Sequence, residues 1–167
     1  MPLLLEQGKE PIILRILAVL VLLIGGAMIY VRLAPSNPET WHTDPTAATA
    51  PARGGWLIRP EGGNGAAPVF ATDPAALLAA LDTVAMAGPR TLRLAGSVEE
   101  GRITYISRSR LWGFPDYTTV TTVAVGEGAA PVIWARQRFG ADDLGVNRAR
   151  VEGWLTQLAE VVPTQAP

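Results

Sequence analysis

Arginine side chains gather in two stretches of the C-terminal half of the chain. The first stretch covers residues 108–116 and the second covers residues 136–150. A guanidinium group is a planar fork that matches a carboxylate or a phosphate, and the amides of a helix N-terminus add positive potential. We therefore expect a ligand-binding pocket for an anionic small molecule or lipid head group, built from Arg108, Arg110, Asp116, Arg138, Asp143, Asn147 and Arg148.

The spacing of these arginines predicts how they would be placed. Residues two apart on a strand point to one face, so Arg108 would share a face with Arg110, and Arg136 with Arg138. An antiparallel strand between the two stretches would bring both pairs to one edge of a sheet. The last helix would begin at the same edge.

Carboxylates in the same stretches support a different reading. Asp116, Asp142 and Asp143 could pair with the arginines and form a network that only holds the fold together. Two hypotheses therefore stand at this point. The domain binds a protein partner or an anionic ligand through its arginine cluster, or it is a structural or assembly factor whose arginines form salt bridges.

The counts of cysteine and histidine favour a non-enzymatic role but leave an enzyme as an alternative. The chain has no cysteine and one histidine, which excludes thiol nucleophiles, disulfides and two-histidine metal sites. Ser107 and Ser109 have no histidine in their domain to activate them, so a hydrolase is the weaker alternative. The glycine-rich run at residues 62–65 lacks the lysine of a phosphate-binding loop. No cofactor or metal is expected.

The overall composition points to a membrane. Among 167 residues, 49% are hydrophobic and only 17% are charged, and the net charge is −1. The near balance of charges argues against nucleic acid as a partner. The apolar excess indicates that part of the chain lies in a medium other than water.

One segment accounts for that excess. Residues 12–33 are apolar apart from Arg15 and Arg32 near the two ends, and 22 helical residues reach roughly 33 Å, enough for the bilayer core. A cleaved signal peptide is disfavoured because Arg32 occupies a position where a cleavage site needs a small residue. Lys9 and Arg15 before most of the segment weakly favour a cytoplasmic N-terminus.

The remaining chain divides by composition. We expect a tail at residues 1–11, a transmembrane helix at 12–33, a Pro/Ala-rich linker at 34–55, an α+β domain at 56–162 and a C-terminal tail at 163–167. The linker has no apolar periodicity and predicts an extended spacer. Its Trp41 and His42 are interpreted as an interfacial tryptophan with a solvated neighbour, rather than a ligand or pH-sensing pair.

Within the domain, hydrophobic periodicity predicts two helices. The first begins at Pro74 with Asp73 as its cap, and one helical stripe follows it. The second begins near Asp142 or Asp143 and carries the stripe of Trp154.

Residues rich in Val, Ile and Thr predict strands between these helices, and a short one precedes the first. The turns between successive strands are too short for parallel crossovers. The fold expected is α+β: an antiparallel four- to five-stranded sheet with two helices packed on one face. The strands expected are 56–59, 91–98, 102–111, 117–125 and 132–139, with a short extended segment at 67–71.

The two arginine stretches also resemble a known family. One run reads Arg-Ser-Arg, then Gly-Phe and Asp, over residues 108–116. The other places Arg138, Gly140, Asp143 and the run Gly-Val-Asn-Arg of residues 145–148 at matching spacing. Together they are similar to the DUF1499 family over roughly residues 56–159. The resemblance implies a small α+β domain, often bacterial and often membrane-tethered, with no established activity. A single-pass protein of the bacterial inner membrane with a periplasmic domain is the placement expected.

Overall fold

The computed structural model describes residues 9–165, and it divides into two compact units between Ala34 and Pro35. The first unit is helix α1, Lys9–Leu33. Its apolar span, Pro11–Leu33, is 23 residues long with a mean hydropathy of 2.8. The helix is therefore long and apolar enough to cross a membrane, as a signal sequence can also be.

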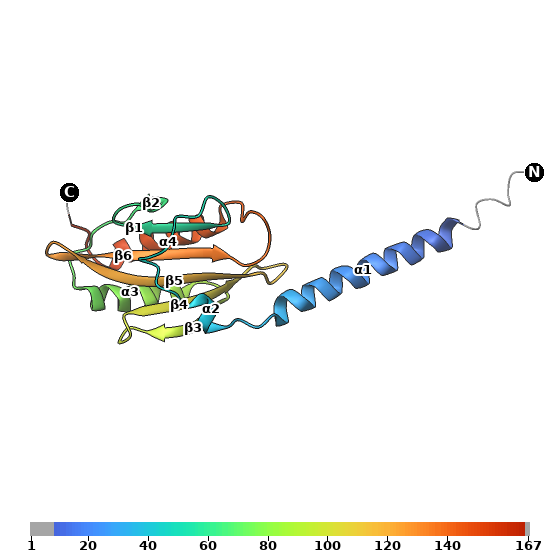
Figure 1. Ribbon diagram of the computed structural model, residues 1–167, viewed down its shortest axis with the longest axis horizontal. Coiled ribbons are helices and arrows are strands. Elements are labelled where there is room, and N and C mark those ends of the chain that lie inside the picture. Colours follow the sequence, from blue (N-terminus) through green and yellow to red (C-terminus); the bar gives the residue numbers. More distant parts are fainter. Residues whose placement is uncertain (1–8, 166–167) are drawn as a thin grey trace, which may run out of the picture. The chain divides into compact units, whose positions relative to one another are not determined.

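The second unit is built on one sheet (Figure 1). The strands are β1 Gly55–Arg59, β2 Gly65–Ala66, β3 Thr91–Ser97, β4 Arg102–Arg108, β5 Pro115–Val125 and β6 Gly128–Gln137. Strands β3 to β6 form an antiparallel meander, and the order across the sheet is β2-β1-β6-β5-β4-β3.

The predicted sheet is correct in class but wrong in two details. It has six strands rather than four or five, and it is mixed, because β2 pairs with β1 in parallel. The segment predicted at 67–71 contributes only isolated bridges of Phe70. Two-residue strands such as β2 carry too little periodicity to be seen in a sequence.

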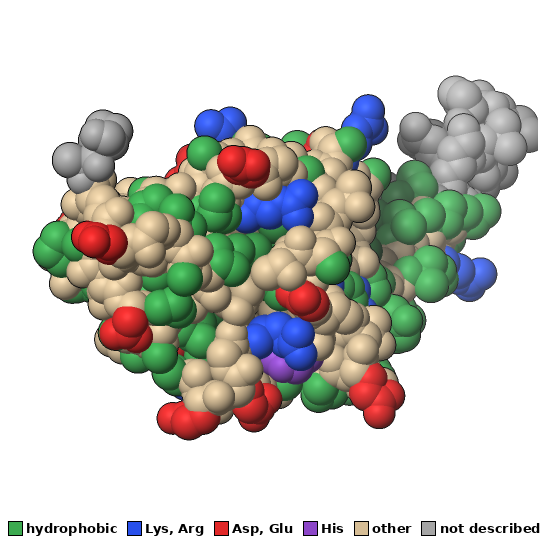
Figure 2. Space-filling model, turned by 60° about the vertical axis from the view of Figure 1, so that its left-hand side comes forward, with side chains coloured by type: hydrophobic (Ala, Val, Ile, Leu, Met, Phe, Trp, Pro, Cys, Tyr) green, Lys and Arg blue, Asp and Glu red, His purple; other side chains and the backbone are tan. Residues whose placement is uncertain are grey.

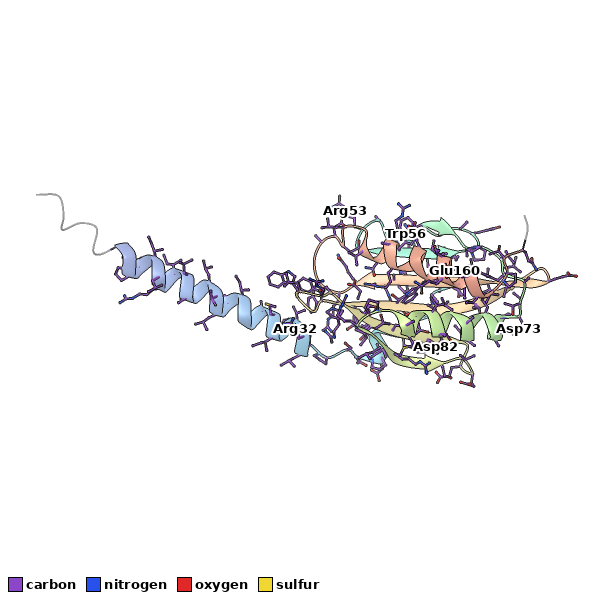
Figure 3. The ribbon with its side chains drawn as sticks, turned by 180° about the vertical axis from the view of Figure 1, so that it is seen from behind. Arg32, Arg53, Trp56, Asp73, Asp82 and Glu160 are labelled. Carbon is purple, nitrogen blue, oxygen red and sulfur yellow. The ribbon has the colours of Figure 1, made fainter. Side chains whose placement is uncertain are left out.

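Two helices, α3 Pro74–Ala87 and α4 Val146–Val161, cover one face of the sheet as predicted (Figure 3). Asp73 caps α3 through the amide of Ala76, with Pro74 in the first position. Both helices share one core with the sheet. Trp154 of α4 packs edge-on against Tyr105 of β4, with ring centroids 5.6 Å apart.

Helix α4 begins later than predicted. Leu144 and Gly145 have φ values of 52° and 80°, and left-handed residues cannot belong to a right-handed helix. Asp143 still serves the first turn, because its carboxylate accepts the amides of Gly145 and Asn147.

The opposite face of the sheet is covered by residues 35–51, which we call the N-terminal segment. It includes the short helix α2, Pro38–Trp41, which Figure 1 shows in front of the sheet. Trp41 stacks on Tyr117 of β5 at 3.8 Å, and Ala48 joins a small core with Leu57 and Val132. This segment is packed on the domain and therefore differs from the extended spacer that its proline content predicts.

Candidate functional site

A cavity of about 560 Å³ opens on the helix side of the sheet, between the end of α3, the first three turns of α4 and the adjoining ends of β3 and β4. Four arginines contribute to its lining: Arg90, Arg108, Arg110 and Arg150. None of the sixteen described residues that line it is acidic. The cavity is therefore a concave site with positive charge and no lining carboxylate.

The inner part of the cavity combines hydroxyls with an apolar wall. Thr91 and Ser107 are buried, and their side-chain oxygens lie 2.9 Å apart in a hydrogen bond between β3 and β4. Val84 and Trp154 supply apolar surface beside them. A ligand with both an anionic and an apolar part fits such a lining, since binding sites are mostly apolar with a few placed polar groups.

The loop after β4 supplies the arginine that is available to a ligand. Arg110 is exposed, and its guanidinium has no hydrogen bond or ion pair within residues 9–165. The loop is closed by Ser109, whose hydroxyl accepts the amide of Phe114 and whose amide donates to the Phe114 carbonyl, each at 3.0 Å. The loop is thus held in shape while Arg110 remains uncommitted.

In the part of the chain that the structure describes, two further arginines at this edge donate only to backbone carbonyls. Arg90 Nε donates to the Arg108 carbonyl at 2.9 Å, and Arg108 Nη1 donates to the Gly113 carbonyl at 3.0 Å. A guanidinium has five N–H donors, so one such bond leaves most of each group unused. These bonds also order the loop, which ends the strand at Arg108 and removes the predicted shared strand face of Arg108 and Arg110.

Arg150 lies at the centre of the site, although the sequence did not single it out. Its Nη1 donates to Asn147 Oδ1 at 2.6 Å, and its Nη2 lies 3.0 Å from Asp116 Oδ2. The only signal available was helical spacing, because residues three apart on a helix are neighbours. Burial raises the pKa of Asp116 above its ordinary value; Arg150 opposes that shift, and the nearby Asp143 adds to it.

The structure brings together some of the predicted residues and separates others. Asp116, Asp143 and Asn147 lie around Arg150, and Arg108 and Arg110 line the cavity. Arg148 instead lies over the ring of Trp56 at 4.8 Å and pairs with Glu152. Figure 3 labels Trp56 beside α4.

Arg138 and Arg136 belong to the opposite face of the sheet. Arg138 Nη1 donates to the Pro35 carbonyl at 2.8 Å and to the Tyr117 hydroxyl at 3.2 Å. The prediction that Arg136 and Arg138 share a face is therefore correct, but that face is not the one with the cavity. The predicted cluster of arginines is accordingly divided among three places: the cavity, the opposite face of the sheet, and the surface of α4 that carries Arg148.

Arg136 anchors the N-terminal segment. Its guanidinium carbon lies 3.8 Å from the ring centroid of Trp134 and 5.4 Å from that of Trp41, and Nη2 donates to the Trp41 carbonyl at 2.6 Å. Burial lowers the pKa of Arg136 to about 10. Carbonyl and hydroxyl acceptors, not a carboxylate, hold this cation in the described chain.

His42 is part of the same face. Its Nδ1 lies 2.9 Å from the Thr104 hydroxyl, and Arg102 Nε donates to its Nε2 at 3.3 Å. Figure 2 shows the histidine in purple against arginine atoms in blue. Burial and the Arg102 charge lower the pKa of His42. It is thus a packed residue rather than the solvated neighbour expected.

Among the described residues that line the cavity there is neither a histidine nor a carboxylate. Ser107 and Ser109 face the helix side, whereas His42 bonds to Thr104 on the other face. Within residues 9–165, no group of three or more potential ligating side chains could hold a metal ion. The chemistry at hand is recognition by guanidinium and hydroxyl groups.

The family model described as "Protein of unknown function (DUF1499)" matches residues 33–158. The chain belongs to the DUF1499 family. The matched residues include the N-terminal segment, so in this DUF1499 chain the segment is part of the family domain rather than a linker outside it. No curated protein matches the chain.

Proposed function

We propose that this DUF1499 domain is a membrane-anchored binding module for an anionic ligand that carries an apolar part. The observation that carries the proposal is the cavity of about 560 Å³, with four arginines and no carboxylate among its described lining residues. Arg110 is the main contact, because it is uncommitted. Arg90 and Arg108 supply further positive charge, whereas the charge of Arg150 is balanced by Asp116.

The position of the cavity adds support. Val146 and Ala149 of α4 are among its lining residues, so the cavity lies beside the first turn of that helix. The buried Thr91 and Ser107 hydroxyls provide neutral donors and acceptors below the arginines. Phosphate and carboxylate groups share the chemistry that this arrangement recognises.

We further propose that α1 remains attached and anchors the domain in the bacterial inner membrane, with the domain in the periplasm. Arg32 stands where a signal-peptide cleavage site needs a small residue, and Pro35 follows directly after Ala34. Lys9 and Arg15 lie toward the N-terminal end of the apolar span, as expected for a cytoplasmic start.

A second candidate is a structural or assembly role. The Arg150–Asp116 ion pair, with side chains only 16% and 13% exposed, favours it for Arg150. It does not extend to Arg110, which forms no ion pair within the described residues.

Binding of inorganic phosphate and of dodecyl phosphate to the full chain in a non-ionic detergent tests the proposal. Calorimetry of Arg110→Ala should show binding about 10- to 150-fold weaker than that of the parent, since one guanidinium–phosphate contact is worth about 1.5–3 kcal/mol. Arg53→Ala is the matched control, because Arg53 is also exposed and uncommitted but lies outside the cavity. Equal affinities for all three proteins would overturn the proposal. Tighter binding of dodecyl phosphate than of phosphate supports an amphipathic ligand.

A further inference from the structure

Large apolar side chains are exposed to solvent at one end of the second unit. We call this surface the apolar tip and define it by the exposed residues Leu111, Trp112, Leu144 and Val146 together with the half-buried Phe114 and Phe139. Exposures within it reach 69% for Leu111 and 91% for Leu144. The loops that carry it, between β4 and β5 and between β6 and α4, leave the same end of the sheet (Figure 1), because Asp116 pairs with Gln137.

The apolar tip is one connected surface. Trp112 and Phe114 are stacked with centroids 6.3 Å apart, and Phe114 lies 6.1 Å from Phe139. A cleft of about 220 Å³ has Phe114, Phe139, Leu144 and Val146 in its lining, together with polar residues that include Asp116, Asp142 and Asp143. Isolated apolar residues on a surface are ordinary, but a contiguous exposed patch marks an interaction site.

The backbone at Leu144 indicates that the exposure has a use outside the domain. Its φ of 52° is left-handed, a conformation that costs a bulky residue energy and that Asn or Gly adopts with less strain. The Asp142 carboxylate holds the turn by accepting the Leu144 amide at 2.9 Å. A leucine here is strained and almost fully exposed, so the domain itself is not stabilised by it.

Two arginines lie at the margin of the apolar tip. Arg110 precedes Leu111, and the guanidinium carbon of Arg138 lies 5.0 Å from the ring centroid of Phe139. Two carboxylates in the second loop, Asp142 and Asp143, accept backbone amides of the turn that follows. Aromatic rings with arginines at their margin are typical of a surface that enters the head-group region of an anionic bilayer.

The second unit begins at the same end of the sheet as the apolar tip. The Pro35 carbonyl accepts the hydrogen bond of Arg138, whose neighbour is Phe139 of the apolar tip.

We infer that the apolar tip docks onto the surface of an anionic bilayer and orients the domain on the membrane that holds α1. This inference rests on the membrane anchorage proposed above but not on ligand binding in the cavity. The occupant is the lipid surface itself. Leu111 and Trp112 would insert at head-group level, with Arg110 and Arg138 facing lipid phosphates.

The absence of cysteine permits a direct test. Ala141→Cys, in the loop beside the tip, would carry an environment-sensitive fluorophore on the full chain reconstituted in phosphatidylcholine vesicles, with or without about 30% phosphatidylglycerol. Ala124→Cys is the matched control, because Ala124 is exposed nine residues along β5 from Pro115, roughly 30 Å from the tip. Flotation with the vesicles after an alkaline wash reports anchorage separately.

The inference predicts blue-shifted emission at position 141 and quenching by lipids labelled near the head group, stronger in anionic vesicles, and neither at position 124. Adding Trp112→Ser should reduce that quenching at least about threefold, whereas mere tethering would leave it unchanged. The inference would be overturned if the labels at positions 141 and 124 behaved alike, or if the quenching did not depend on Trp112→Ser or on lipid charge. It would also be overturned if the label at position 141 were shielded only when another protein was added. A chain that fails to float would overturn the anchorage instead.

Discussion

Arg150 Nη2 and Asp116 Oδ2 lie 3.0 Å apart and form an ion pair that joins α4 to the start of β5. The first turn of the same helix is capped by Asp143. Both side chains of the ion pair are largely buried, so losing one leaves the other without compensation. Arg150→Ala should lower the free energy of unfolding by about 3 kcal/mol. Urea denaturation of the full chain in detergent measures this.

The control for that prediction is two residues away on the same helix. Arg148 pairs with Glu152, but their side chains are 57% and 49% exposed. A solvated i,i+4 pair is worth only tenths of a kcal/mol. Arg148→Ala should therefore stay within about 1 kcal/mol of the parent, and equal losses for both variants would show that burial does not distinguish the two pairs.

The pH dependence of stability should report His42. Burial and the Arg102 charge lower its pKa below the ordinary 6.5, while Glu100 opposes the shift. The unfolded chain therefore takes up a proton more readily than the folded one, and this contribution to stability is lost as the pH falls below about 6.5. When the pH is lowered from about 7.5 to about 5, the melting temperature of the parent should fall more steeply than that of His42→Gln.

That comparison isolates one group. Asp116 has a raised pKa and acts in the opposite direction, since its contribution to stability falls as the pH rises, but it is present in both proteins. Parallel curves for parent and variant would contradict the assignment to His42.

Arg136 should control the attachment of the N-terminal segment. Its guanidinium lies between Trp41 and Trp134 and donates to the Trp41 carbonyl and the Thr119 hydroxyl. Arg136→Ala removes these bonds and should cost about 2 kcal/mol, with faster hydrogen exchange concentrated in residues 35–51. Exchange that rises uniformly over the sheet, or not at all, would argue against a specific anchor.

The strained backbone at Leu144 predicts a gain in stability. Leu144→Asn should raise the free energy of unfolding by up to about 1 kcal/mol, because Asn tolerates a positive φ better than Leu does. The same variant should weaken the quenching of the position-141 label by anionic lipid. A stability loss, measured by thermal unfolding, would show that the leucine is needed by the fold itself.

Sequence periodicity predicted the meander, α3 and the placement of both helices on one face. It could not predict the packing of the N-terminal segment, because this segment, rich in Pro, Ala and Thr, shows no regular spacing of apolar residues. Its contact between Trp41 and Arg136 also joins positions 95 residues apart. The predicted start of α4 was too early. The Asp143 carboxylate does accept a first-turn amide, but the helix begins only after Leu144 and Gly145, which are left-handed.

The candidate site was predicted in part. The two stretches do meet, since the start of β5 pairs with the end of β6. The expectation that residues two apart on a strand share a face failed for Arg108 and Arg110, because the strand ends at Arg108 and a closed loop follows. It was correct for Arg136 and Arg138 but could not say which sheet face they occupy. Arg148 and Arg150 are two residues apart on α4, which directs them to different sides of the helix.

Arginine footprinting tests the central proposal most directly. The full chain in detergent would be treated with phenylglyoxal, with and without dodecyl phosphate, and the modification of each arginine followed by mass spectrometry. We predict that the ligand protects Arg110 strongly while leaving exposed Arg53, outside the cavity, as reactive as before. Unchanged reactivity of Arg110, or equal protection of both arginines, would contradict anion binding in the cavity between α3 and α4.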